Sequence, residues 1–227
     1  MTDLAHWSPR ARPESRVHEG RYVRLEPLNP AQHGDDLHKA CSGPEAEGLF
    51  RYLFEKPPQT RDGFQGWLER SAASTDPLYF AVVDRDTGRA VGRLTFMRID
   101  TVHGVIETGS ILFGPALART RGATEAIYLQ ARHAFDDLGY RRFEWKCNDL
   151  NEPSKRAAVR FGFTFEGVFR QHMVVKGQNR DTAWYAMLDR DWPRRKRAFE
   201  SWLSPDNFSA TGEQRRSLLA FHGDEGI

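Results

Sequence analysis

The sequence predicts a mixed α/β fold, in which helices cross a sheet that combines parallel and antiparallel strands. Three observations support this prediction. Residues 142–147 alternate, with the aromatic residues and Cys147 on one face, as expected for a strand. Residues 124–138 instead repeat apolar side chains at helical spacing, and Gly139 follows as a typical helix terminator. Over the second half of the chain the predicted order is two strands, helix, strand, helix and two strands, which requires crossover helices.

The first half of the chain is predicted to supply a short strand, two helices and a β-hairpin. Residues 21–25 alternate polar and apolar side chains, and a turn-forming Asp-Arg-Asp-Thr-Gly run separates two apolar stretches. The predicted elements are a strand at 21–25, a helix at 30–42, a turn-rich segment at 43–58, a helix from Thr60 or Asp62 to about Ser74, and strands at 78–83 and 90–97 joined by a turn at 84–88.

The second half supplies the central crossovers and a tail. Its predicted elements are a strand at 105–113, the helix at 124–138, the strand at 142–147, a short helix capped by Asn151 and stopped by Gly162, and strands at 166–175 and 182–188 joined by residues 176–180. We expect residues 1–19 to form a polar arm that packs through Trp7, residues 20–190 to form the main domain, and residues 191–227 to form a helical extension with a loop at 204–212.

Composition indicates a soluble protein and argues against several functional classes. The chain has 227 residues, enough for one domain with an extension, and its net charge of +2 gives no field of the kind that nucleic-acid-binding proteins use. No apolar run approaches the ~18 residues of a membrane span, and the N-terminus lacks an apolar signal segment. Two cysteines without metal-ligand spacing favour a reducing compartment. We therefore expect a cytoplasmic protein without a metal, a membrane or a nucleic-acid partner.

The turn at 119–124 is predicted to bind phosphate. It lies between the strand at 105–113 and the following helix, where backbone N–H groups at a helix N-terminus lie beside two arginines. Such an arrangement attracts phosphate. The turn lacks the Lys-Ser or Lys-Thr pair of a nucleotide P-loop, and the chain lacks a GxGxxG motif. The phosphate is therefore expected to belong to another kind of cofactor, the alternative being an ordinary polar turn.

Four short motifs follow one another at a specific spacing. They are Glu107-Thr-Gly109, Ala123-Thr-Glu-Ala126, Asn151-x-x-Ser154 and Gly162-Phe163-x-x-Glu166-Gly167. With them, residues 20 to 190 resemble the GNAT superfamily of acetyl-CoA-dependent acyltransferases, in particular its RimJ/RimL-like branch. The resemblance implies the GNAT architecture: a mixed, mostly antiparallel central sheet flanked by helices, in which two parallel strands splay and pantetheine enters between them.

The resemblance implies acetyl-CoA as the cofactor. The family pattern at the phosphate turn is Gln/Arg-x-x-Gly-x-Gly/Ala. Aligned on the Ala-Thr-Glu-Ala motif, Arg121 stands at the central glycine; shifted by one residue, Gly122 takes that place and Thr124 the last position. Backbone donors suffice for phosphate binding. The expected cofactor contacts are Ile111, Leu112 and Phe113, whose N–H groups would polarise the thioester carbonyl, together with Arg119, Thr120, Arg121, Gly122, Ala123, Thr124, Asn151 and Ser154.

Glu107 is the expected general base. An amine must be neutral to attack a thioester, and a lysine-like amine with a pKa of ~10.4 is neutral in fewer than about one in 10³ molecules at pH 7. A carboxylate can accept that proton directly or through water. The alternative is a sheet carboxylate paired with an arginine such as Arg93 or Arg98.

Ser154 is the second catalytic candidate. The resemblance places it where many relatives carry a Tyr or Ser near the cofactor sulfur, so that its hydroxyl would donate to the departing thiolate, and it places Asn151 beside the pantetheine arm. Asn at an N-cap and Ser two or three residues later are also common helix-start residues without a catalytic role. Both interpretations stay open.

The resemblance also suggests which residues frame the acceptor pocket. We expect residues 43–58 and the turn at 176–180 to set specificity, as loops on a rigid sheet often do. The candidates are Phe50, Tyr52, Phe54, Arg170, His172, Arg180, Asp181 and Tyr185. A core position is the alternative for most of the aromatics.

The leading interpretation is an N-acetyltransferase that moves acetyl from acetyl-CoA to a primary amine, by direct transfer in a ternary complex. The amine is expected to belong to a protein N-terminus, an amino acid, an antibiotic or another small molecule. The alternatives are a non-catalytic acyl-CoA sensor and a nucleic-acid-associated protein using the basic run at 194–197, which the balanced net charge disfavours. A homodimer is left open.

Overall fold

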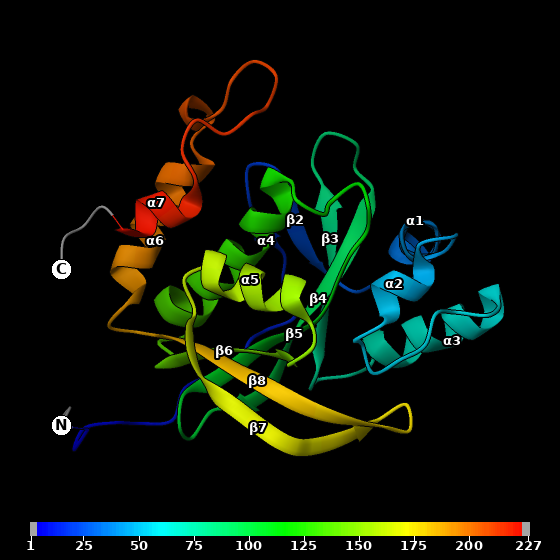
Figure 1. Ribbon diagram of the computed structural model, residues 1–227, viewed down its shortest axis with the longest axis horizontal. Coiled ribbons are helices and arrows are strands. Elements are labelled where there is room, and N and C mark those ends of the chain that lie inside the picture. Colours follow the sequence, from blue (N-terminus) through cyan, green and yellow to red (C-terminus); the bar gives the residue numbers. More distant parts are fainter. Residues whose placement is uncertain (1–3, 224–227) are drawn as a thin grey trace.

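The computed structural model describes residues 4–223, in which eight strands form a single sheet (Figure 1). The strand order is β1-β2-β3-β4-β5-β6-β8-β7. Neighbouring strands are antiparallel except for β5 and β6, which are parallel. The strands are β1 (His18–Glu19), β2 (Val23–Pro27), β3 (Leu78–Asp84), β4 (Ala90–Asp100), β5 (Val105–Phe113), β6 (Arg142–Asn148), β7 (Thr164–Val175) and β8 (Gln178–Leu188).

The helices form three groups around this sheet. In Figure 1, α1, α2 and α3 lie together at one side, α4 and α5 lie near the middle strands, and α6 and α7 stand at the opposite side. The helices are α1 (Pro30–Cys41), α2 (Ala46–Phe50), α3 (Arg61–Ala72), α4 (Arg121–Arg132) with a π-helical continuation (His133–Asp137), α5 (Glu152–Arg160), α6 (Trp192–Leu203), a 3₁₀ turn (Pro205–Asn207) and α7 (Leu218–Gly223). None of these helices, within residues 4–223, is long and apolar enough to cross a membrane.

The sheet is buried on both faces, and β3 shows this most directly. Its residues Phe80 and Val82 belong to the larger core cluster, together with residues of α4 and α6. Ala81 and Val83, which alternate with Phe80 and Val82 along the strand, belong to a second cluster with residues of α1 and α3. Because successive side chains of a strand point to opposite faces, α4 and α6 cover one face of the sheet, and α1 and α3 cover the other.

The predicted splayed parallel pair is confirmed. Residues 105–108 of β5 pair with residues 142–145 of β6, and the pairing then stops. Both strands continue, β5 to Phe113 and β6 to Asn148, each held along its other edge by an antiparallel neighbour. The mixed, mostly antiparallel sheet expected from the sequence therefore opens into a gap beyond Thr108 and Trp145.

A β-bulge lies on the β5 side of this gap. Leu112 pairs with Arg93 and Gly109 with Thr95, so three steps along β5 match two along β4. Ser110 takes up the extra residue with a φ of 47°. Bulges of this kind redirect side chains and backbone groups, and here the redirected segment faces the gap.

Helix caps explain most of the element boundaries. The side chain of Thr60 caps α3 by accepting a hydrogen bond from the N–H of Gly63 at 3.0 Å, so Thr60 rather than Asp62 starts that helix. Asn151 caps α5 as expected, accepting from the N–H of Ser154 at 3.2 Å. The helix predicted to begin near Thr124 begins at Arg121, because the Thr120 side chain caps it.

The last hairpin is tighter than predicted. Val175 pairs with Gln178, so β8 begins four residues earlier than the predicted strand at 182–188. The turn needs only Lys176 and Gly177, which both have positive φ values, of 53° and 77°. This is the geometry that favours two-residue hairpin turns.

Both terminal segments pack on the domain. Trp7 donates from its indole Nε1 to the carbonyl of Val102 at 2.8 Å, so the arm does pack through this residue. Tyr22 donates its hydroxyl to the carbonyl of Leu203 in the extension at 3.0 Å. Phe199 of α6 is fully buried in the larger core cluster. The predicted tail at 224–227 lies outside the described residues.

We predict that the protein loses stability as the pH falls below about 6.5, because of buried neutral histidines. Burial, and next the charge of neighbouring His133, lower the pKa of His18 to about 3. In the unfolded chain an ordinary histidine, with a pKa near ~6.5, binds a proton earlier. The unfolded state therefore gains protons between pH ~6.5 and ~3, so the stability present above this window is lost within it.

The measurement is the unfolding midpoint temperature between pH 7.5 and 4.5. His18→Gln should show a shallower fall than wild type, while the control His103→Gln, at an exposed position, should follow wild type. Equal slopes for wild type and His18→Gln would contradict this explanation.

Candidate active site

The gap between β5 and β6 holds two adjoining pockets that share one wall. The shared wall consists of Ile111, Phe113, Trp145, Asn151, Pro153 and Ser154. We call the first the inner pocket; its other lining residues include Tyr52, Phe54, Arg98, Glu107, Leu112, Lys146, Cys147 and Arg180. We call the second the outer pocket; its other lining residues include Arg119, Thr120, Arg121, Ala123, Thr124, Arg160, Trp202 and Phe208.

The outer pocket is lined by three arginines and by no acidic residue. Within residues 4–223, Arg119, Arg121 and Arg160 make no ion pair with a carboxylate. Arg121 lies between two rings, with its guanidinium carbon 4.7 Å from the centroid of Tyr22 and 4.8 Å from that of Phe208. Cationic groups that no protein carboxylate neutralises suit a multiply charged anion.

The turn at the start of α4 supplies the polar groups of this pocket. Thr120 is exposed and caps the helix. Gly122 packs closely on β2, since a Cβ there would lie 2.7 Å from Cγ1 of Val23. Thr124 is buried and accepts a hydrogen bond from Nη1 of Arg160 at 3.0 Å. The helix N-terminus, with its partial positive charge, thus opens into the outer pocket.

Sequence reasoning missed Arg160 and the contribution of the C-terminal extension. Arg160 ends α5, and burial lowers its pKa. Trp202 and Phe208, from the extension, line the outer pocket, and the guanidinium carbon of Arg160 lies 4.8 Å from the Trp202 ring centroid. In the sequence, the basic residue Arg160 lies two positions before Gly162, and this was a signal from which an anion-binding role could have been predicted. Nothing in the helical pattern of the extension indicated which surface it covers.

Glu107 lies in the inner pocket within a chain of ion pairs. Its two carboxylate oxygens each accept from Nη1 of Arg98 at 2.8 Å, and one of them also lies 2.9 Å from Nζ of Lys146. Lys146 in turn pairs with Glu144 at 2.6 Å. Of the two arginines suggested as partners, Arg98 is the one that pairs with Glu107. Arg93 pairs with another carboxylate.

Ser154 and Asn151 lie on the wall shared by both pockets. Asn151 caps α5 through the N–H of Ser154, and the Ser154 hydroxyl oxygen accepts from Nε1 of Trp145 at 3.0 Å. The Ser154 O–H therefore remains able to donate. Cys147 is nearby, but burial raises the pKa of its thiol, so this thiol is a poor nucleophile at neutral pH.

The structure brings only some of the acceptor candidates together. Tyr52, Phe54 and Arg180 line the inner pocket. The others lie elsewhere: Phe50 and Tyr185 are buried in the core, Arg170 and His172 are exposed on β7, and Asp181 accepts hydrogen bonds from the N–H of Gln171 and the side chain of Asn179.

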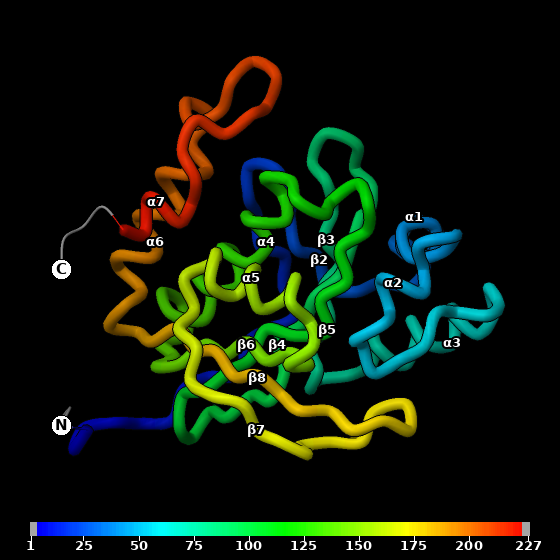
Figure 2. The backbone as a smooth tube through the Cα atoms, viewed as in Figure 1, coloured from blue at the N-terminus to red at the C-terminus, as the bar shows by residue number. Residues whose placement is uncertain are grey.

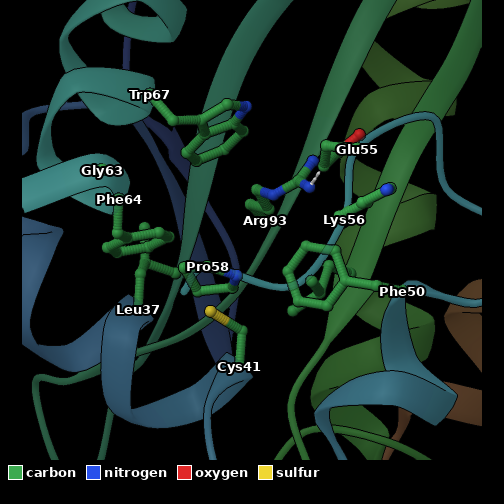
Figure 3. A pocket seen from close by; sticks show the side chains of 11 residues that line it. Leu37, Cys41, Phe50, Glu55, Lys56, Pro58, Gly63, Phe64, Trp67 and Arg93 are labelled. Atoms are coloured by element: carbon green, nitrogen blue, oxygen red, sulfur yellow. Dashed lines mark hydrogen bonds and ion pairs between the residues drawn. The ribbon is translucent and has the colours of Figure 1, made fainter. Parts of the chain in front are cut away.

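Phe50 faces a different, smaller pocket between α1, α3 and β4 (Figure 3). There it lies near Cys41 and the ion pair between Arg93 and Glu55. The short helix α2 explains the difference, because it turns Phe50 inward to the second core cluster while Tyr52 follows on the side of the inner pocket.

The segment at 43–58 is hydrogen-bonded to the hairpin turn at 176–180 and to the loop before α5. Tyr52 donates its hydroxyl to the carbonyl of Leu150 at 3.0 Å, and Lys176 at the hairpin turn donates from Nζ to the carbonyl of Phe50 at 2.7 Å. Figure 2 shows the β7–β8 hairpin reaching toward the side of the molecule that carries α2 and α3. The segment around α2 is therefore tied to two neighbouring elements.

Residues 23–164 match the family model described as the acetyltransferase (GNAT) domain. The chain belongs to the GNAT acetyltransferase family. Its enzymes transfer acetyl groups from acetyl-CoA, and the cationic outer pocket is consistent with the phosphates of that donor. Within residues 4–223, no group of three or more His, Cys, Asp or Glu side chains is placed to hold a metal ion.

Solved GNAT structures and a curated relative resemble the chain. A GCN5-related N-acetyltransferase from Brucella melitensis is 54% identical, with a TM-score of 0.95, over 96% of this chain and 99% of that one. A probable GNAT acetyltransferase from Chromobacterium violaceum is 40% identical, with a TM-score of 0.79, over 85% and 96%. The uncharacterized N-acetyltransferase YoaA of Bacillus subtilis is 32% identical over 49% of this chain and 62% of its own length, less than two thirds of that relative.

We predict that Phe50→Ala lowers stability and leaves the KM for the acceptor unchanged. Removing a buried phenylalanine costs ~3–5 kcal/mol, which corresponds to a fall in Tm of roughly 6–20 °C for a chain of this size. Phe54→Ala is the matched variant, because Phe54 is 42% exposed and lines the inner pocket. It should change acceptor KM with little loss of Tm. A Phe50→Ala protein with wild-type Tm and altered acceptor KM would place the acceptor in the smaller pocket.

Proposed function

We propose that this chain is an N-acetyltransferase of the RimJ/RimL-like branch, which transfers acetyl from acetyl-CoA to a primary amine in a ternary complex. One observation supports it above the others. Two pockets meet at the point where β5 and β6 separate, one cationic and free of carboxylates, the other containing Glu107. A donor and an acceptor can thus approach the same wall from opposite sides.

In this proposal the outer pocket and the shared wall hold the donor. The turn at 119–124 and Arg160 bind its phosphates, Asn151 lies beside its pantetheine arm, and the bulged segment at 111–113 polarises its thioester carbonyl. The N-terminus of α4 and the three arginines, which make no ion pair with a carboxylate within residues 4–223, support this assignment. Trp202 and Phe208 give the same pocket an aromatic side supplied by the extension at 191–227.

The chemistry requires one nucleophile, an acceptor for the amine proton and a hydrogen-bond donor to the departing thiolate. The neutral amine attacks the thioester carbonyl carbon, the C–S bond breaks, and the thiolate leaves with the acyl group now on nitrogen. Glu107 accepts the proton released by the amine, directly or through water. The Ser154 hydroxyl, which already accepts from Trp145, donates to the departing sulfur.

A non-catalytic acyl-CoA sensor is the second candidate. The observation that favours it is the pairing of Glu107, whose two oxygens both accept hydrogen bonds from cationic donors. A carboxylate held in this way is also what a purely structural ion-pair chain would show. A sensor would bind acetyl-CoA and release no thiol with any amine.

Thiol release from acetyl-CoA, measured across amino acids, peptides, polyamines and aminoglycosides, separates the two candidates. The transferase predicts release that depends on the amine. Tight acetyl-CoA binding without release, for every amine offered, would support the sensor.

We further propose a cytoplasmic location, which the two free, buried cysteines support.

We predict that Arg119→Ala combined with Arg121→Ala weakens acetyl-CoA binding by at least about tenfold, because two cations near the donor phosphates are lost. Calorimetry at low and high salt measures this. The difference from wild type should shrink at high salt, where screening already weakens the wild-type contacts. Arg156→Ala removes an exposed arginine of α5 that lines neither pocket, and should bind like wild type. Unchanged affinity in the folded double variant would contradict the assignment.

We predict that Glu107→Gln lowers turnover by at least about tenfold while acetyl-CoA affinity stays close to wild type, since Gln cannot accept the amine proton and residue 107 does not line the outer pocket. The loss should be largest at low pH, where fewer acceptor amines are already neutral. Glu144→Gln is the control, because it breaks the same ion-pair chain at Lys146 without lining either pocket. If Glu144→Gln lowers turnover as much as Glu107→Gln does, the role of Glu107 is structural.

A further inference from the structure

Arg180 is a buried cation in the inner pocket, and no carboxylate of the described residues pairs with it. It is only 7% exposed and lies on β8, two residues before Thr182, the first β8 residue that pairs with β6. Its Nε donates to the hydroxyl oxygen of Thr182 at 3.3 Å. Within residues 4–223 no aspartate or glutamate oxygen lies within ion-pair distance of its guanidinium.

The other cations of this pocket are neutralised. Arg98 and Lys146 both pair with Glu107, and Lys146 also pairs with Glu144. Three cationic side chains and one carboxylate line the inner pocket, and Glu144 beside it supplies a second carboxylate through Lys146, so Arg180 accounts for the remaining unbalanced charge. Burial lowers the pKa of Arg180, as expected where a charge has lost water without gaining a counter-ion. Such a group is costly to a fold unless something outside the fold compensates it.

The guanidinium is also oriented for an anion. Its Nε is occupied by Thr182, which leaves the two terminal nitrogens to donate side by side. Its carbon lies 4.9 Å from the ring centroid of Phe54, which supports it from the segment after α2. Two parallel N–H donors in a fixed plane match the two oxygens of a carboxylate.

We propose that Arg180 binds the carboxylate of the acceptor, so that the acceptor is an amino-acid-like molecule carrying both an amine and a carboxylate. The inference rests on the proposed acetyl transfer. Glu107 and Arg180 line the same pocket, so the amine and the carboxylate of one small molecule meet opposite charges there. Polyamines and aminoglycosides carry several positive charges and are repelled by the excess cation. The amine of a protein N-terminus has no carboxylate on its own residue unless its side chain supplies one.

The test uses matched acceptor series: the common amino acids, their carboxamides and their decarboxylated amines, each with acetyl-CoA and thiol release as the readout. Wild type should prefer the carboxylate over the amide of the same side chain by at least about tenfold in kcat/KM. Arg180→Met should lose this preference and keep activity on the amides. Arg180→Lys should retain part of the preference for the carboxylate, because lysine keeps the positive charge but lacks the two parallel N–H donors of a guanidinium. Arg170→Ala, at an exposed position outside the pocket, should keep the wild-type preference.

A second readout separates this inference from the transfer activity. Calorimetry with CoA and N-acetylated amino acids, compared with their amides, measures carboxylate recognition without turnover. Wild type should bind the acids more tightly, and Arg180→Met should bind acids and amides alike. The Tm of Arg180→Met should equal or exceed that of wild type, because an unpaired buried charge is removed.

If no amine is acetylated, the proposed function is wrong, and calorimetry alone tests whether Arg180 binds a carboxylate. Equal affinity of wild type for acids and amides, or an unchanged preference in folded Arg180→Met, would overturn the inference.

Discussion

The separation of β5 and β6 after four paired residues is the constraint on which the candidate site depends. Each strand stays in place because its other edge is hydrogen-bonded to an antiparallel neighbour, β4 or β8. The gap is therefore a stable part of the sheet and requires no flexible loop. The bulge at Ser110 turns one edge of the gap, and the helix capped by Asn151 closes the other. Both pockets exist because these two strands stop pairing.

The charges around the gap divide into two kinds. Glu107 pairs with Arg98 and Lys146, and Lys146 also pairs with Glu144. Removing one partner of the buried Glu107–Lys146 pair would leave the other charge uncompensated, which generally costs ~3–5 kcal/mol. Within residues 4–223, Arg160 and Arg180 are desolvated cations without a carboxylate partner. One faces the outer pocket and the other the inner pocket. The two anionic ligands that we propose would compensate these charges on both sides of one wall.

The C-terminal extension completes a site that lies mostly within the matched family domain. The family model ends at residue 164, whereas Trp202 and Phe208 lie well beyond it and line the outer pocket. Their positions follow from α6, which packs into the main core through Phe199. The extension is thus held by the same hydrophobic core as the domain, and its side chains are positioned before any ligand arrives.

The sequence alone determined the local structure: Asn151 as a cap, the strands and helices in their order, and the mixed sheet. These features depend on spacing and capping, which act over a few residues. The splayed parallel pair was expected only from the resemblance to the family, and the structure decided between Thr60 and Asp62 as the cap of α3. The sequence also indicated Arg98 as one of two possible partners of Glu107. Only the tertiary structure decided that Lys146 joins this pair, that Phe50 turns into a separate core, and that Arg160 and Trp202 share a pocket. Periodicity shows which face of an element is buried, but which distant element covers that face depends on packing across the whole chain.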